Sequence, residues 1–280
     1  MAQLKTRRKK PQSYSGYLKL HELLQLQHPV SYPPQHDEML FVVAHQTYEL
    51  WFKLMLTELE SAIDDMYRGE AREAARLLGR VVAVLHVLTQ QLGVLETIRP
   101  NDFAKFRDTL RPASGFQSTQ FRELEFISGQ KDERFLDLHK DDPKGIEALT
   151  KRMESPSLWD GFLHLLGKKG LLKVGNTSSS LEVKAIASVY SDSPNSDVAD
   201  LADALLEYDE AFWLWRNHHV GMVERIIGRN VGTGSAAVSE TLGPYSFQRS
   251  GVSYLKTTLR RRFFPELWAA RTKIGQNRKS

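Results

Sequence analysis

The apolar residues of this chain recur at helical spacing over three long segments, and this periodicity limits the possible fold more than any other feature. Residues 38–68, 70–97 and 197–228 each carry an apolar stripe with the three- and four-residue steps of an α-helix. The start of the first segment is apolar on nearly all sides, which predicts a helix at the centre of the core. No segment alternates apolar and polar residues as a half-buried strand does. We therefore predict an all-α protein, a bundle of long helices with smaller helices packed around it.

Shorter helices are expected around these three. Residues 14–27 have helical spacing up to a proline-rich stretch, after which Asp37 is a candidate N-cap for the first long helix. Ser118 is expected to begin another helix. Residues 130–196 are more polar and less periodic, and His139 within them is expected at the surface or partly buried. We predict an outer layer there, with short helices near residues 132–139, 143–153 and 156–166. A further helix is expected near the C-terminus, over residues 252–264.

Length and composition indicate a soluble globular protein. The chain has 280 residues, of which 41% are hydrophobic and 26% charged, and we predict a single domain over residues 13–280. Residues 1–12 are basic and are expected to form a flexible tail. No apolar run reaches the ~18 residues of a membrane span, so no membrane partner is expected. The body has no basic stripe with interleaved aromatic residues, which argues against a nucleic-acid partner. A cytoplasmic location is expected.

The complete absence of cysteine removes several classes of chemistry. Disulfides, thiolate zinc sites, iron–sulfur clusters, cysteine nucleophiles and thiolate-ligated haem are all excluded. A bound metal would have to be held by histidine, carboxylate or tyrosine. The chain offers nine histidines for that purpose.

Three of these histidines lie on apolar helical faces. His218 and His219 are adjacent in the third long segment, which ends in a Gly-Thr-Gly turn at residues 232–234. Such a histidine can ligate a metal or haem iron, and it can equally be an ordinary core residue; the spacing does not choose between them. His45 shares one face with Phe41, Tyr48 and Phe52 at positions i, i+4, i+7 and i+11 counted from Phe41. For His45 alone, a buried structural histidine is the commoner interpretation.

Arg107 is a candidate ligand-binding residue because it lies one helical turn from Phe103. A guanidinium and an aromatic ring that face the same way suit a ligand with a carboxylate and a planar ring, since arginine binds carboxylates in a bidentate manner. A structural ion pair with an acidic neighbour is the alternative. Ser114 and Gly115, in the loop that follows, are candidates for hydrogen bonds to the same ligand.

Five blocks of the sequence resemble the tryptophan 2,3-dioxygenase family, haem enzymes that open the indole ring of L-tryptophan. The blocks occur in the family's order and cover most of the chain outside residues 130–195. The resemblance implies insertion of both atoms of O2 across indole C2 and C3 of L-tryptophan or a close analogue, which yields N-formylkynurenine. It also implies haem b as cofactor and a homotetramer. The matching blocks are YSGYLKLHELL, HDEMLFVVAHQTYELWFK, VLETIRPNDFAKFRDTLRPASGFQSTQFRELE, LWRNHHVGMVERIIGRNVGTG and FFPELWAART.

The resemblance assigns roles to residues that match the family's motifs. His219 begins an H-x-x-x-V-x-R-x-I-G pattern and matches the proximal ligand of the haem iron. His45 matches the distal histidine, with Phe41 one turn before it. Arg107 matches the arginine that holds the substrate carboxylate, and Thr233 the threonine near the substrate's ammonium and carboxylate groups.

Further residues would complete the substrate pocket. Phe103, Ser114 and Gly115 lie in the same block as Arg107. Three N-terminal residues match positions that complete the pocket of a neighbouring subunit in the family, namely Tyr14, Tyr17 and Leu18.

Two departures from the family pattern bear on the substrate and the reaction. Phe103 stands where the family typically has tyrosine, and after Gly234 the family's G-T-G-G-S-S-G run is interrupted by SAAVSETLGPYSFQR. A modified lid can change substrate choice. One alternative is therefore a divergent relative that transfers a single oxygen atom to a substituted tryptophan, such as β-methyltryptophan, with an external reductant. Another is a non-catalytic haem sensor, which would need the iron ligand but not Arg107 and His45 together.

Overall fold

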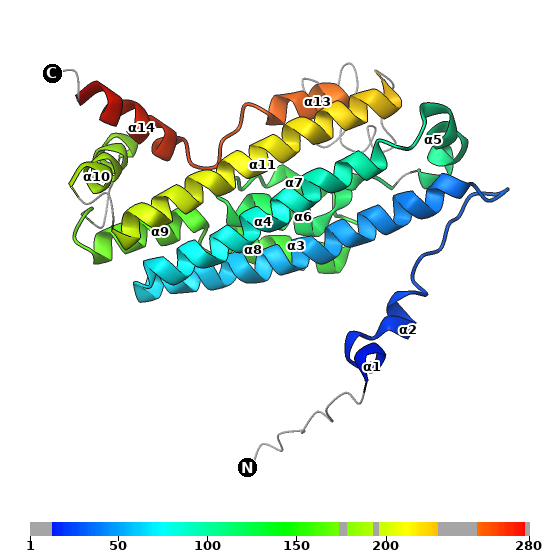
Figure 1. Ribbon diagram of the computed structural model, residues 1–280, viewed down its shortest axis with the longest axis horizontal. Helices are drawn as coiled ribbons and strands as arrows, with labels where there is room; N and C mark the ends of the chain where they lie inside the picture. Colours follow the sequence, from blue (N-terminus) through cyan, green and yellow to red (C-terminus); the bar gives the residue numbers. More distant parts are fainter. Residues whose placement is uncertain (1–12, 112, 174–177, 193–195, 229–250, 278–280) are drawn as a thin grey trace, which may run out of the picture.

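Three long helices lie side by side and form the body of the protein (Figure 1). The structure, a computed structural model, describes residues 13–111, 113–173, 178–192, 196–228 and 251–277, and no strand occurs among them. Helix α4 (Ala71–Leu95) packs against both α3 (His36–Arg68) and α11 (Asp197–Ile227). Helices α3 and α4 run antiparallel, whereas α11 runs in the same direction as α4. The predicted all-α bundle of long helices is confirmed.

Local signals explain where the long helices begin and end. Gly69 ends α3 with a positive φ of 94°, and its N–H donates to the carbonyls of Asp65 and Met66. The Ser196 hydroxyl accepts the Ala199 N–H at the start of α11. The predicted N-cap at Asp37 is wrong, because α3 already begins at His36. Asp37 lies in its first turn, where a carboxylate interacts favourably with the helix dipole.

Smaller helices cover one face of the layer formed by α3, α4 and α11, the face that points away from the viewer in Figure 1. Ser118 caps α6 (Thr119–Ile127) as predicted. The predicted short helices in residues 130–170 are present as α7 (Arg134–Asp137), α8 (Pro143–Glu154) and α9 (Leu158–Lys168). No helix was predicted over residues 179–192, where α10 (Ser179–Asp192) lies. Its buried Val183, Ile186 and Val189 belong to the core, and the helix packs on α14 (Pro265–Asn277).

The C-terminal helix predicted over residues 252–264 is shorter than expected. Helix α13 (Gly251–Thr258) ends before the chain passes along α11 to α14. Buried Asp209 of α11 explains this path, because its carboxylate accepts the backbone N–H groups of Phe263 and Phe264 and the indole N–H of Trp268. These bonds satisfy backbone donors that a helix would otherwise have to pair.

The N-terminal residues form an arm that projects away from the bundle (Figure 1). The single helix predicted over 14–27 is interrupted at Lys19, whose φ of 55° separates α1 (Tyr14–Leu18) from α2 (Leu20–Leu23). Tyr14 and Tyr17 are 75% and 71% exposed. The arm joins the body where the Gln27 side chain donates to that of Gln46 at 2.6 Å.

One end of the bundle gathers segments that are far apart in the sequence. The first turns of α3 lie beside the last turns of α4 and α11, with α5 (Pro100–Arg107) and α13 nearby (Figure 1). Among the described helices, α4 alone has the length and hydropathy of a membrane span; it packs between α3 and α11, as a core helix does.

Candidate active site

A cavity of about 290 Å³ opens at this end of the bundle. Its walls come from α3, α4, α5, α6, α11 and α13 and are mainly apolar, with a small number of polar groups. Mostly apolar walls with a few placed polar groups are typical of small-molecule sites. The aromatic rings in the wall belong to Phe41, Tyr48, Phe52, Phe103, Phe116, Phe121 and Trp215.

The structure separates the two adjacent histidines of α11. His219 lines the cavity and is partly buried. His218 is turned to the surface, where its ring lies 3.5 Å from the carboxylate of Glu96. Neighbouring residues on a helix point about 100° apart, and on α11 this step directs His219 toward the cavity and His218 toward solvent.

His219 is held as a neutral imidazole. Burial lowers its pKa to about 4, and protonation of nearby His45 would lower it further. Its ring stacks on the indole of Trp215, with the ring centroids 5.1 Å apart and an angle of 13° between the planes. A neutral imidazole is the form of histidine that ligates metals.

We expect the depressed pKa of His219 to make stability depend on pH. In the unfolded chain the pKa of histidine is about 6.5, so between pH 6.5 and 4 the unfolded state binds more protons than the folded state. The part of the unfolding free energy that depends on neutral His219 is therefore fully present above pH 6.5. It is lost progressively as the pH falls from 6.5 through the folded-state pKa of about 4. From pH 7 to pH 4, cofactor-free wild type should lose up to about 3 kcal/mol more unfolding free energy than His219→Gln.

Denaturant titrations of both proteins at the two pH values check this expectation. An equal loss in wild type and variant would show that His219 titrates normally in the folded chain.

His45 faces the same cavity from α3. Its Nδ1 lies 2.7 Å from the backbone carbonyl of Phe41. The centroids of the His45 and Phe41 rings are 4.0 Å apart. Because a carbonyl only accepts, Nδ1 carries the proton and Nε2 is left as an acceptor. His45 is an exposed residue, yet the atoms packed around its ring lower the pKa of His45 by desolvation, against the opposing effects of the Phe41 carbonyl and Glu49. His45 is therefore a neutral hydrogen-bond acceptor.

The residues predicted around Arg107 also line the cavity. Arg107 and Phe103 both lie on α5 and contribute to its wall. The ring of Phe103 lies 5.8 Å from that of Phe41, across the gap between α5 and α3. Ser114 and Gly115 belong to the same wall, where Ser114 caps a short 3-10 helix over Gly115–Gln117.

Three of the predicted site residues do not line this cavity. Tyr14, Tyr17 and Leu18 are on the N-terminal arm and are exposed. Thr233, like the loop that follows it, lies outside the described residues.

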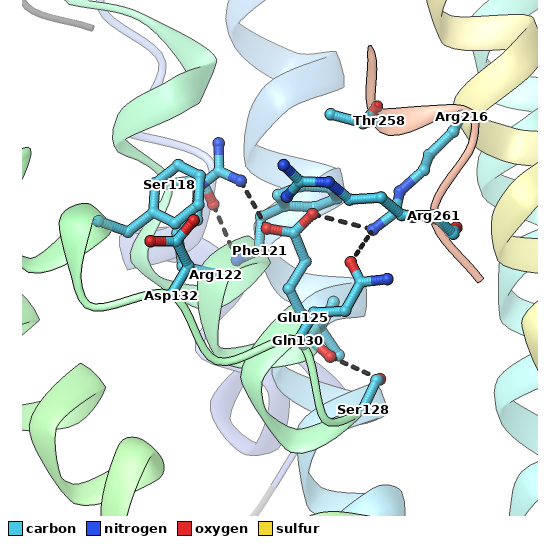
Figure 2. Close-up of polar contacts among 12 residues, drawn as sticks. Ser118, Phe121, Arg122, Glu125, Ser128, Gln130, Asp132, Arg216, Thr258 and Arg261 are labelled. Atoms are coloured by element: carbon cyan, nitrogen blue, oxygen red, sulfur yellow. Dashed lines mark hydrogen bonds and ion pairs between the residues drawn. The ribbon is translucent and has the colours of Figure 1, made fainter. Parts of the chain in front are cut away.

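A buried charged cluster forms another part of the wall and was missed by sequence reasoning (Figure 2). Glu125 of α6 accepts from Arg122 at 2.5 Å and from Arg216 of α11 at 2.9 Å. Arg216 also donates to the Gln130 side chain and to the Arg261 carbonyl. Arg122 and Arg216 are 3% and 4% exposed, so their charges are removed from water. One carboxylate faces two guanidinium groups, which leaves a net positive charge at the cavity.

Only one of the two ion pairs in this cluster, that between Arg122 and Glu125, could be predicted from the sequence. Arg122 and Glu125 are spaced i, i+3 on a capped helix, a spacing that favours an ion pair. Arg216 joins them from a position 91 residues away from Glu125, and its place among aromatic residues gives no indication of its partner.

These groups fit a flat, anionic, metal-containing cofactor. The aromatic walls match a planar macrocycle, and neutral His219 is a potential iron ligand. Among the described residues the buried Nε of Arg122 has no hydrogen-bond partner, and the surplus positive charge favours an anion. Carboxylate groups on the cofactor would supply that anion.

The fold and the site together define an all-α protein with a mainly apolar small-molecule cavity. The family model for tryptophan 2,3-dioxygenase matches residues 2–173 and 168–274, and the chain belongs to this family. A tryptophan 2,3-dioxygenase from a Nocardioides species is 42% identical over 94% of each chain. The enzyme of the same name from Herpetosiphon aurantiacus is 40% identical over 94% of this chain and 98% of its own. The predicted family is thus confirmed.

Proposed function

We propose that this protein is a haem b-dependent dioxygenase that converts L-tryptophan and O2 to N-formylkynurenine. The observation that carries this proposal is that one cavity brings together His219, His45 and Arg107. The relatives named above, which span nearly the whole chain, are tryptophan 2,3-dioxygenases. No comparison favours a mono-oxygenase or a sensor.

Two sets of residues would hold the cofactor. His219 would ligate the haem iron as a neutral imidazole, and Arg122 and Arg216 would face the carboxylates of the haem edge. Once bound, the haem iron supplies the capacity to bind and activate O2. The remaining work of the site is to bind and orient the amino acid.

The substrate would be held at both of its ends. Arg107 would bind the α-carboxylate, and Thr233 is expected to contact the carboxylate and ammonium groups. The Nε2 acceptor of His45 would take the indole N–H, because Nδ1 is already bonded to the Phe41 carbonyl. The rings of Phe41 and Phe103 would pack on the indole and exclude water.

The isotope content of the product tests the reaction type. The ferrous, haem-loaded protein is incubated with L-tryptophan and ¹⁸O2, and the product mass is read. Two labelled atoms without added reductant are expected. One labelled atom, from L-tryptophan or β-methyltryptophan with a reductant, would instead establish mono-oxygenation. Absence of any product from either substrate would reject the proposal.

We also propose a cytoplasmic homotetramer in which each arm enters a neighbour's pocket. The exposed rings of Tyr14 and Tyr17 support this assembly, because isolated arms rarely present large aromatic side chains to water. Further exposed apolar side chains lie on the body and would also be covered by a neighbour: Met39, Val43 and Leu50 on α3, and Val87 and Val94 on α4.

Mixed oligomers should reveal pockets shared between subunits. Arg107→Ala damages the body of a pocket and Tyr17→Ala damages the arm, so each homo-oligomer should have low activity. Co-expressed together in equal amounts, they should recover activity in about a quarter of the pockets, where an intact body meets an intact arm. Activity no higher than the mean of the two single variants would show that the arm does not reach another subunit's site.

A further inference from the structure

His219 differs from His45 and His139, each of which also follows an aromatic residue by four positions. Nδ1 of His45 lies 2.7 Å from the carbonyl of Phe41, four residues earlier, and Nδ1 of His139 lies 2.8 Å from that of Phe135. In the described part of the chain, no hydrogen bond joins either ring nitrogen of His219 to a protein group. The ring instead lies nearly parallel to the side chain four residues earlier, the indole of Trp215.

Trp215 is itself fixed from several directions. It is 7% exposed, and its indole N–H donates at 3.4 Å to the hydroxyl of Tyr48, which donates at 2.6 Å to the Leu88 carbonyl. The rings of Phe121 and Phe212 lie 5.5 and 6.0 Å from it. The indole plane is therefore set by α3, α4 and α6 as well as by its own helix.

The carboxylates near this end of the bundle are already engaged. Glu96 lies between His218 and Arg225, at 3.5 and 3.4 Å. Glu49, which lines the cavity, accepts from Ser118 and Gln120. A ligand histidine is commonly oriented by a carboxylate or carbonyl on its second nitrogen, and neither Glu49 nor Glu96 takes that role here.

We infer that Trp215 is the positioning residue of His219, and that its indole face sets the plane of the imidazole. This inference rests on the proposed ligation of haem iron by His219. A stacked ring resists rotation of its neighbour out of the parallel arrangement. Replacement of the indole by a side chain without a ring should thus let His219 adopt several orientations, whereas a phenyl ring should preserve one.

Three variants of the haem-loaded protein test this inference. Trp215→Leu removes the ring, and Trp215→Phe keeps an aromatic face. Trp159→Leu is the matched control, since Trp159 stacks on Phe264 at 5.7 Å and 21° in the core without lining the cavity. The readouts are the iron–histidine stretching band of the ferrous protein in resonance Raman spectra and the haem dissociation constant.

Wild type, Trp215→Phe and Trp159→Leu should each give one narrow band. Trp215→Leu should give a broadened or split band, with a haem dissociation constant raised about 10-fold or more. A single unshifted band in Trp215→Leu would overturn the inference, as would equal broadening in Trp159→Leu. If Trp215→Leu does not fold, Trp215→Met, which also lacks a ring, takes its place: a broadened or split band supports the inference, and a single unshifted band overturns it. Absence of an iron–histidine band from wild type would instead reject the proposed ligation itself.

Discussion

His219→Ala is expected to abolish stable haem binding by this protein. His219 is the neutral, partly buried histidine on the α11 wall of the cavity, and the chain has no cysteine to replace it. Under the proposed ligation, this change removes the bond between the protein and the haem iron. Titration of the purified apoprotein with haem, followed by its Soret absorbance, measures the effect.

The adjacent histidine provides the control for this experiment. His218→Ala alters an exposed side chain paired with Glu96 and should leave haem binding close to that of wild type. Added imidazole should restore part of the Soret spectrum of His219→Ala, because it can occupy the space of the missing ring. Full haem occupancy in His219→Ala without imidazole would disprove the ligand assignment.

Arg107→Ala is expected to raise the KM for L-tryptophan while haem binding is retained. Removal of one partner of a desolvated, hydrogen-bonded charge pair costs about 2–5 kcal/mol, which corresponds to a change of about 30-fold to several thousand-fold. Steady-state kinetics under saturating O2 measure it. The loss should be much smaller for a substrate analogue without the carboxylate.

Arg111→Ala is a suitable comparison for Arg107→Ala. Arg111 follows α5 by one turn, pairs with Asp108 at 3.2 Å and does not line the cavity. Its replacement should leave KM unchanged. An unchanged KM in Arg107→Ala as well would reject the proposed carboxylate clamp.

The long helices were predictable because their signals are local and repeated. The apolar stripes of α3, α4 and α11 are each carried by many residues, so errors at single positions do not matter. Boundaries and isolated features depend on fewer contacts. Helix α10 was missed because its buried residues are few and surrounded by polar ones. His139, expected at the surface or partly buried, is only 3% exposed, and carbonyl contacts to both of its ring nitrogens, from Phe135 and Gln117, make this burial possible.

The site was predictable only in part, for a related reason. Residue spacing placed Phe41 and His45 on one face and Phe103 with Arg107 on another, and both faces meet at the cavity. Spacing alone did not distinguish His219 from His218; the family motif did, and the structure turns only His219 inward. The pairing of Arg216 with Glu125 depends on how α11 packs beside α6, which no local pattern encodes.

The surplus charge of the Arg122–Glu125–Arg216 cluster has a consequence for the cell that makes this protein. A chain without its cofactor keeps an uncompensated cation against a hollow, largely apolar wall, and a ligand that binds only the folded state stabilises it by mass action. Newly made chains that find no haem would spend more time open to proteases. The amount of enzyme in the cell would then follow the supply of iron porphyrin, even when synthesis of the polypeptide is constant.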